Sequence, residues 1–264
     1  MSSFNPFSLA GKVALITGGG RGIGEGIARA FGDAGSSLVL VARTRDDVDR
    51  VAADVISTGG RALALTADIT DVSGLPNIVE RTVREFGRLD IVVNCAGGGD
   101  MWRAITDNTV DELEDAFHFN VAAPFELVRS AVPYLLEQPG SSVVNIVSAA
   151  IHQPARGHLA YDAAKGALCY VTRSMAAGLG PRIRVNGIMP GIIETDAMKA
   201  VVSAREGALD QLVARTRLRR LGTPADIGLA AVFLASPAAS YITGVCLDVD
   251  GGVVGEMSPR FPDL

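Results

Sequence analysis

The glycine-rich turn at residues 18–24 constrains the fold of this chain more than any other feature. It follows a short apolar run, residues 12–17, which is typical of a buried parallel strand, and a helical pattern follows at residues 25–31. Strand, turn and helix form a cradle for phosphate groups, because glycine lets the backbone approach them and a helix N-terminus presents amide donors. The residues of this turn that are expected to bind a dinucleotide are Gly18, Arg21, Gly22, Ile23 and Gly24.

Apolar runs alternate with helical patterns along the rest of the chain. Further strands are expected at residues 37–42, 61–66, 89–94, 142–148, 184–189 and 245–250. This alternation predicts an α/β fold, a Rossmann-type doubly wound parallel sheet of about seven strands with helices on both faces. No linker or repeat interrupts the pattern, so one domain is expected over residues 1–264. A charged, irregular helical segment at about 191–221 follows a strand end, where a substrate lid is expected.

Charge and cysteine content exclude several classes of partner. The net charge is −5 with a pI near 5.3, and no basic block is present, which argues against nucleic acid. No uncharged apolar run reaches membrane-spanning length, and the first residues lack the pattern of a signal peptide. The three cysteines, Cys95, Cys169 and Cys246, have no motif spacing, so we expect reduced thiols in a cytoplasmic protein and not a disulfide or zinc framework.

Tyr161 and Lys165 carry the sharpest chemical signal, because on a helix they lie one turn apart on the same face. A tyrosine that exchanges protons near neutrality needs its pKa lowered by about 3 units, or about 4 kcal/mol. An ammonium about 4 Å away supplies roughly that much at an effective dielectric constant of about 20. Only three of the 24 Lys+Arg residues are lysines, and a compact ammonium can approach both a phenol and a ribose. The alternative is a solvent-facing helix that happens to carry one aromatic residue and one cation.

Two further polar residues are expected beside this pair. Ser148 ends the strand predicted at 142–148 and Tyr161 stands on the next helix, so both hydroxyls can converge on one carbonyl oxygen. Asn120 lies within a long helix predicted over residues 111–136. No nucleophile elbow surrounds Ser148, and the three histidines lack metal-ligand spacing, which argues against a serine hydrolase and against a metal site.

The end of the second strand bears on the choice of dinucleotide. Where dinucleotide folds often place a carboxylate on the adenosine ribose, this chain has Ala42 followed by Arg43 and Thr44. Arg43 offers a charged fork to a 2′-phosphate, and Arg21 could reach the same place. We therefore expect NADP(H) as the preferred cofactor, with NAD(H) as the second choice. The alternative is that both arginines are solvated surface charges.

Together, the motifs resemble those of the short-chain dehydrogenase/reductase family over almost the whole chain, from about residue 9 to residue 252. They are Thr17-Gly-Gly-Gly-Arg-Gly-Ile-Gly24, Asn94-Cys-Ala-Gly97, Asn120, Ser148, Tyr161-x-x-x-Lys165 and Pro190-Gly191. The one departure is Cys95, where the family often has a second asparagine. The resemblance implies that Tyr161 is the acid and base, and that Ser148 polarises the substrate oxygen. It also implies that Lys165 lowers the pKa of the tyrosine and binds the nicotinamide ribose, and that Asn120 holds a water in a proton relay.

The same resemblance implies the remaining cofactor contacts. Asp68 and Ile69 would flank the adenine, while Arg43 and Thr44 would lie at the adenosine ribose. Asn94, Ala96 and Gly97 would support the cofactor after the fourth strand. Thr195, with the backbone near Ile193, would hold the carboxamide, and Pro190 and Gly191 are also expected to bind the cofactor.

These residues predict an NADP(H)-dependent oxidoreductase that interconverts a small-molecule ketone and a secondary alcohol. Residues 190–198 are similar to both 3-oxoacyl-carrier-protein reductases and bacterial hydroxysteroid dehydrogenases, and the resemblance implies a homo-oligomer, a tetramer. The arginines at 215–220 could meet an acidic carrier protein or form a solvated face. The alternative function is a non-catalytic dinucleotide-binding sensor or scaffold, although such proteins tend to lose the tyrosine or the lysine.

Overall fold

The computed structural model describes residues 5–99, 102–204, 206–254 and 257. Its strands form one sheet in which neighbours are parallel, in the order β3-β2-β1-β4-β5-β6-β7. The strands are β1 (Val13–Thr17), β2 (Ser37–Ala42), β3 (Arg61–Thr66), β4 (Ile91–Asn94), β5 (Ser141–Ile146), β6 (Ile183–Pro190) and β7 (Cys246–Val249). The predicted Rossmann-type α/β fold is confirmed.

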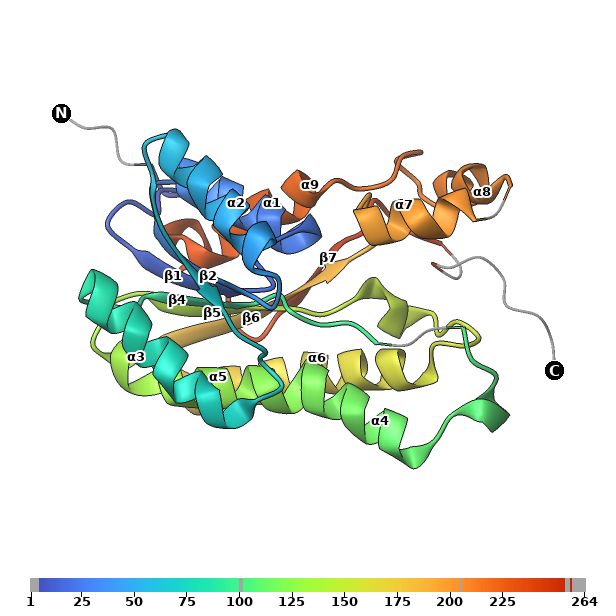
Figure 1. Cartoon of the computed structure of the whole chain (residues 1–264), viewed down its shortest axis with the longest axis horizontal. Coiled ribbons are helices and arrows are strands. Elements are labelled where there is room, and N and C mark those ends of the chain that lie inside the picture. The colour runs from blue at the N-terminus through green and yellow to red at the C-terminus, as the bar shows by residue number, and fades with distance from the viewer. Residues whose placement is uncertain (1–4, 100–101, 205, 255–256, 258–264) are drawn as a thin grey trace.

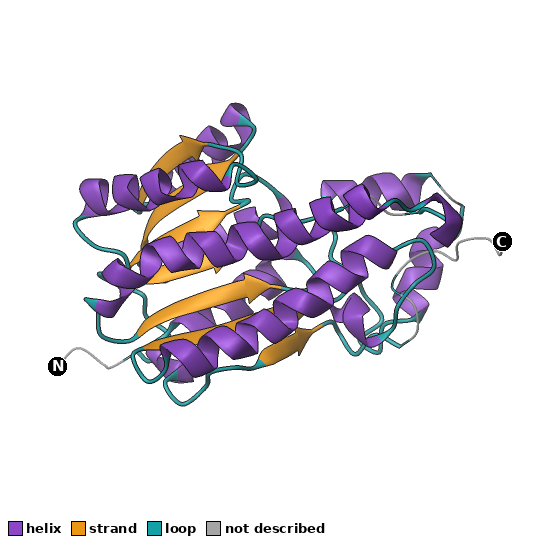
Figure 2. Cartoon of the chain, turned by 90° about the horizontal axis from the view of Figure 1, so that it is seen from below, coloured by secondary structure: helices purple, strands orange, loops and turns teal. Residues whose placement is uncertain are grey.

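Helices cover both faces of this sheet (Figure 1). One face carries α1 (Gly22–Asp33), α2 (Arg45–Ser57) and α9 (Pro224–Ala235), and the other carries α3 (Leu75–Phe86), α5 (Ala123–Leu136) and α6 (Leu159–Leu179), which lie in front of the strands in Figure 2. Beyond the sheet lie α4 (Val110–Phe117), α7 (Asp196–Ser203) and α8 (Ala208–Ala214). Among the described residues, no helix combines the length and the apolarity needed to cross a membrane.

Alternating side chains of the strands build a core on each face. Ile16 of β1 packs in one buried cluster with Phe31 of α1, whereas its neighbour Leu15 packs in the other with Leu127 of α5. Full burial of one such side chain contributes roughly 1.5–3 kcal/mol relative to leaving it exposed. The two cores hold the strands in fixed positions, and residues at the carboxyl ends of the strands are therefore held in place.

Two elements differ from the prediction in ways that affect the site. The helix expected over 111–136 contains a π-helical turn, η3 (His118–Ala122), which carries Asn120. The strand expected to end at Ser148 ends at Ile146 instead, and Ser148 caps the 3₁₀ turn η4 (Ala149–His152). The side chain of Asn120 donates to the carbonyls of Ala116 and Gly98. A π turn is sustained by such contacts, which the apolar periodicity of a sequence does not record.

Candidate active site

The glycine-rich turn lies where the order of the strands reverses, between β1 and β4. Gly18 has a φ of +69°, and a Cβ there would lie 2.8 Å from the amide nitrogen of Ala96. A Cβ on Gly24 would overlap the carbonyl oxygen of Gly18. Only glycine permits these approaches. Arg21, the N-cap residue of α1, makes no side-chain cap, so the first amides of this helix are not satisfied by a capping side chain.

Thr17 joins the ends of β1 and β4 beneath this turn. Its Oγ1 is the acceptor for the amides of Cys95 and Ala96, each at 3.2 Å. The loop after β4 is thereby held against Gly18. Asn94, which was expected to support the cofactor, is buried and donates to the side chain of Asn145 at 2.8 Å, so it supports the strand ends.

The structure places the side chains of Ser148 and Tyr161 near each other, so that the serine favours the ionised form of the phenol. Ser148 is buried, and its Oγ accepts from the amide of Ala150 at 3.2 Å, which fixes the serine at the start of η4. Tyr161 lies in the first turn of α6. A Cβ added to Gly99 would lie 3.5 Å from the Cβ of Tyr161, so the loop after β4 packs on the tyrosine.

Lys165 and Asn120 meet beside Gly97. The ammonium of Lys165 donates to the carbonyl of Ile146 at 2.9 Å, and the side chain of Asn120 accepts from the amide of Gly98 at 3.1 Å. A Cβ on Gly97 would lie 2.8 Å from Lys165 Nζ and 2.9 Å from Asn120 Oδ1. Both side chains are buried. Three segments distant in the sequence thus converge on one polar centre.

Burial governs the protonation of the tyrosine and the lysine. It raises the pKa of Tyr161 above its ordinary value, while the hydrogen bond with Ser148 opposes this effect and the carboxylate of Asp162 adds to it. Burial also lowers the pKa of Lys165 to about 8. We expected Lys165 to lower the pKa of Tyr161, and this is not found. The ammonium lies 5.8 Å from the centroid of the tyrosine ring and donates to the Ile146 carbonyl.

Arg43 and Asp68 stand beyond the ends of β2 and β3, with Arg43 Nη1 4.0 Å from Asp68 Oδ2. The two side chains are 69% and 46% exposed, and such an ion pair typically contributes less than about 1 kcal/mol. Arg43 is therefore available to another anion. Of the other residues expected at this end, Ile69 is buried in the core, whereas Arg21 and Thr44 are exposed.

The segment after β6 returns toward the glycine-rich turn. A Cβ on Gly191 would lie 2.6 Å from the Cα of Asp250, so the turn that follows Pro190 packs tightly on the end of β7. Ile193 is buried. Thr195 caps α7, and its methyl group would lie 3.2 Å from a Cβ on Gly22. Thr195, which is predicted to hold the carboxamide, thus approaches the start of α1.

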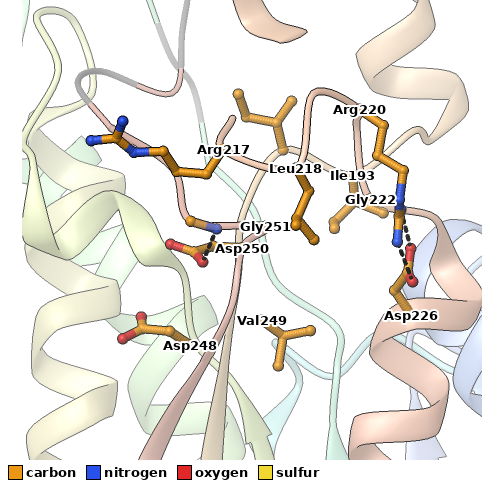
Figure 3. Close-up of a pocket in the computed structure, with 12 residues that line it drawn as sticks. Ile193, Arg217, Leu218, Arg220, Gly222, Asp226, Asp248, Val249, Asp250 and Gly251 are labelled. Carbon is orange, nitrogen blue, oxygen red and sulfur yellow. Dashed lines mark hydrogen bonds and ion pairs between the residues drawn. The ribbon is translucent and has the colours of Figure 1, made fainter. Parts of the chain in front are cut away.

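A cavity of about 420 Å³ lies beside the expected lid (Figure 3). Its lining includes Ile193 and Arg220, and Arg220 turns toward Asp226 and donates two hydrogen bonds of 2.7 and 2.9 Å. Arg219 donates to the Ala214 carbonyl at 2.6 Å. These two arginines are therefore engaged within the protein, which weakens the case for an acidic carrier. Residue 205 of the expected lid lies outside the described residues.

A second cavity, of about 470 Å³, lies beside the loop after β4. It extends from Arg43 and Asp68 to Gly98, Gly99 and Ala160, the residue before Tyr161. Residues 100–101 of the adjoining loop lie outside the described residues. Four features of the site fit a dinucleotide. They are the close backbone approaches that only glycine permits, the uncapped amides of α1, the exposed guanidinium of Arg43 and the buried ammonium of Lys165.

Two features of the site region were not predicted. Asp162, next to Tyr161, is 9% exposed in its side chain, lies 4.0 Å from His158 Nδ1, and has its pKa raised by burial to about 6. The sequence already places Asp162 next to Tyr161 in the first turn of the predicted helix, so its closeness to the tyrosine could have been predicted.

Cys169 Sγ lies 2.9 Å from Cys246 Sγ, although all three cysteines are free. The two cysteines are 77 positions apart in the sequence, so no local sequence pattern indicates their contact. Within the described part of the chain, no cluster of potential metal ligands is present.

Comparisons with known proteins agree with this geometry. Residues 18–254 match the model of a family described as enoyl-(acyl carrier protein) reductase. The chain is 44% identical over 259 residues to an uncharacterized oxidoreductase of Mycobacterium tuberculosis, covering 98% of this chain and 95% of that protein. It is 38% identical over 251 residues to a 7alpha-hydroxysteroid dehydrogenase of Escherichia coli, covering 95% and 97%. A solved 7alpha-hydroxysteroid dehydrogenase, complexed with NADH and 7-oxo glycochenodeoxycholic acid, superimposes with a TM-score of 0.91 at 37% identity, covering 96% of this chain and 99% of that one.

Proposed function

The chain belongs to the short-chain dehydrogenase/reductase family and is an oxidoreductase acting on CH–OH groups, and we propose that it uses NADP(H) to interconvert a ketone and a secondary alcohol. The observation that carries the proposal is the meeting of Ser148, Tyr161 and Lys165 beyond the carboxyl ends of parallel strands, beside the glycine-rich turn. A bound nicotinamide supplies or accepts the hydride. The protein binds and orients both reactants and manages the proton.

Tyr161 is the proposed proton donor to the substrate oxygen when a ketone is reduced, and the acceptor in the reverse direction. Burial raises the pKa of the phenol, so the protonated form predominates near neutrality. That form is the one that reduction of a ketone requires. The hydroxyl of Ser148, which lies near the phenol, holds the substrate oxygen in place.

Lys165 and Asn120 are proposed to restore the proton. The pKa of Lys165, lowered by burial to about 8, leaves the ammonium charged in most molecules at neutrality, yet able to release a proton. Asn120 lies against Gly97, as the ammonium does, and can hold a water between the ammonium and solvent. Lys165 is also the proposed ligand of the nicotinamide ribose, because its three donors exceed the single carbonyl it now contacts.

NADP(H) is the proposed cofactor because Arg43 is exposed and only loosely paired. A 2′-phosphate carries nearly two negative charges, and a hydrogen bond to a charged group is typically worth about 1.5–3 kcal/mol. That range corresponds to roughly 10- to 150-fold in affinity. NAD(H) lacks the phosphate and does not gain this contact.

Changing the adenosine end tests the cofactor preference. Arg43→Ala should raise KM for NADPH far more than KM for NADH, because only the 2′-phosphate contact is lost. The double change Ala42→Asp, Arg43→Ile should reverse the preference, since a carboxylate repels the phosphate and accepts from both ribose hydroxyls. If the unaltered enzyme uses NADH at least as well as NADPH, the proposed role of Arg43 is wrong.

A panel of substrates tests the reaction. Oxidation of NADPH is followed by its absorbance with hydroxysteroid-derived ketones, 3-oxoacyl thioesters and smaller ketones, and the reverse reaction with the matching alcohols. We expect at least one ketone to be reduced, and Ser148→Ala to lower that rate sharply at unchanged affinity for NADPH. Binding of NADPH without turnover of any member would favour the non-catalytic sensor or scaffold.

A further inference from the structure

Two thiols outside the proposed catalytic centre lie in direct contact. Cys169 is on α6, one helical turn beyond Lys165, and Cys246 opens β7. Their sulfur atoms are 2.9 Å apart. The remaining cysteine, Cys95, follows β4 and belongs to neither element. The contact therefore joins the helix of Tyr161 and Lys165 to the last strand of the sheet.

The surroundings hold the two thiols facing each other. Cys169 is 6% exposed and lies in a buried cluster with Val147, Leu168 and Met189, against which the partly exposed Cys246 packs. A Cβ on Gly187, the residue paired with Cys246 across the sheet, would lie 2.9 Å from Cys246 Sγ. The sulfur of Cys246 is thus confined between β6 and α6.

We propose that Cys169 and Cys246 are a site of reversible covalent modification, forming an intramolecular disulfide that fastens α6 to the edge strand β7. A disulfide bond is about 2.05 Å long, so the sulfur atoms must approach by less than about 1 Å. Among the described strands β7 pairs only with β6, so a single strand pairing has to adjust to this small movement.

The oxidant is a hydroperoxide, which the proposal takes from solution. The thiolate of Cys246, the more exposed cysteine, attacks one peroxide oxygen, the O–O bond breaks, and a sulfenic acid forms. The sulfur of Cys169 then displaces the sulfenic oxygen, which leaves as water with the released protons. With hydrogen peroxide the balance is two thiols and one peroxide giving one disulfide and two waters. Two electrons pass from sulfur to oxygen.

Burial makes this reaction slow at neutral pH. Burial and the neighbouring Cys169 raise the pKa of Cys246 to about 12, the guanidinium of Arg173 opposes this shift, and Asp248 adds to it. The reacting species is the thiolate. The rate of disulfide formation should therefore rise by about tenfold for each pH unit between about 7 and 9. An exposed thiol with an ordinary pKa would level off earlier.

Oxidation of the full chain with hydrogen peroxide at about pH 8.5, followed by maleimide capping and peptide mapping without reductant, tests the proposal. We expect a linked peptide that contains Cys169 and Cys246, and one remaining reactive thiol of the three in the sequence. The oxidised protein should unfold about 5–15 °C higher, because the link closes a loop across 77 positions. Dithiothreitol should reverse both changes.

Matched variants separate this disulfide from general oxidation. Cys169→Ser and Cys246→Ala should each lose the linked peptide and the rise in melting temperature, whereas Cys95→Ser should keep both. Three capped thiols after prolonged oxidation of the folded protein would overturn the proposal. So would sulfinic acids or cross-linked chains in place of the linked peptide, or a rise in melting temperature that persists in Cys169→Ser.

Discussion

Gly97 is the residue against which the buried ammonium of Lys165 and the side chain of Asn120 come together. A methyl group there would stand 2.8 Å from Lys165 Nζ and 2.9 Å from Asn120 Oδ1, so one of them must move. Displacing a catalytic group by about 1 Å can cost about 100-fold in rate. We therefore expect Gly97→Ala to lower kcat by about 10- to 100-fold while the protein stays folded. Gly99→Ala is the matched control, because its Cβ meets Tyr161 at an ordinary 3.5 Å. Equal rates for the two variants would contradict this reading.

Asp162 is a second residue whose environment predicts a measurable effect. Burial raises its pKa to about 6, so the native state holds a proton that the unfolded state releases from about pH 4 upward. Stability contributed by this group therefore falls as pH rises from about 4 to 6, and the deficit persists above that range. Asp162→Asn keeps an acceptor for the Ala155 amide and removes the deficit.

The variant Asp162→Asn should be more stable than the unaltered protein by about 1–3 kcal/mol at pH 7.5, and nearly equal to it at pH 4. Urea denaturation at both pH values measures the difference. Asp111→Asn, which removes an exposed carboxylate from the first turn of α4, serves as control and should not stabilise. A gain that is the same at both pH values would mean that titration of Asp162 is not its cause.

At the level of residues, the sequence was informative wherever spacing along one element places groups together. Tyr161 and Lys165 share a helix, and their proximity follows from helical geometry alone. The pKa of Tyr161 could not be predicted from helical geometry, because it depends on burial and on Ser148, and both arise from tertiary packing. The contact of Cys169 with Cys246 is hidden for the same reason, since it forms only when β7 has joined the sheet.

At the scale of elements, the segment before α9 is held by one carboxylate. Asp226 accepts from the amide and the hydroxyl of Thr223, whose own Oγ1 accepts from the Asp226 amide, and it also binds the guanidinium of Arg220. The hydrogen bonds of Arg220 and Thr223 hold the pKa of Asp226 well below its ordinary value. The resulting stability is present above about pH 4 and is lost as pH falls below it. This carboxylate ties the end of the expected lid to a helix that packs on the sheet.

Removal of the Asp226 carboxylate and removal of Arg220 alone should give different costs. Asp226→Ala should lower the free energy of unfolding by about 1–2 kcal/mol, because the capping box is lost together with the ion pair. Arg220→Ala should cost less than about 1 kcal/mol, since its side chain is 52% exposed. Urea denaturation at neutral pH compares the two. A larger loss for Arg220→Ala would show that the ion pair, and not the cap, holds this segment.

Strands and helices were predictable because their periodicity is local, and the ends of β2 and β3 coincide with the sequence pattern. The π turn around Asn120 was not, because it depends on carbonyls supplied by Gly98 and Ala116. The early end of β5 at Ile146 also escaped prediction, since residues 147–148 keep apolar and small side chains while leaving the strand. Both departures occur at proposed catalytic residues, where function competes with regular structure.

For the whole molecule, the exposed apolar side chains favour self-association. Phe125 of α5 and Tyr170 of α6 are 48% and 71% exposed, and Leu229 of α9 is 67% exposed. β7 leaves one edge of the described sheet unpaired, and natural proteins cover such edges. We predict a symmetric homo-oligomer, a tetramer. Light scattering at micromolar concentration measures its mass, and a monomer there would refute the prediction.

The replacement Tyr161→Phe tests the central claim most directly, because it removes the one transferable proton and little else. The measurement pairs steady-state turnover of the best ketone with the dissociation constant of NADPH, obtained from the fluorescence of the bound cofactor. We predict that turnover falls to less than about a hundredth of the unaltered rate, while NADPH binds with nearly unchanged affinity. Retention of more than about a tenth of the rate would contradict the role of Tyr161 as acid and base.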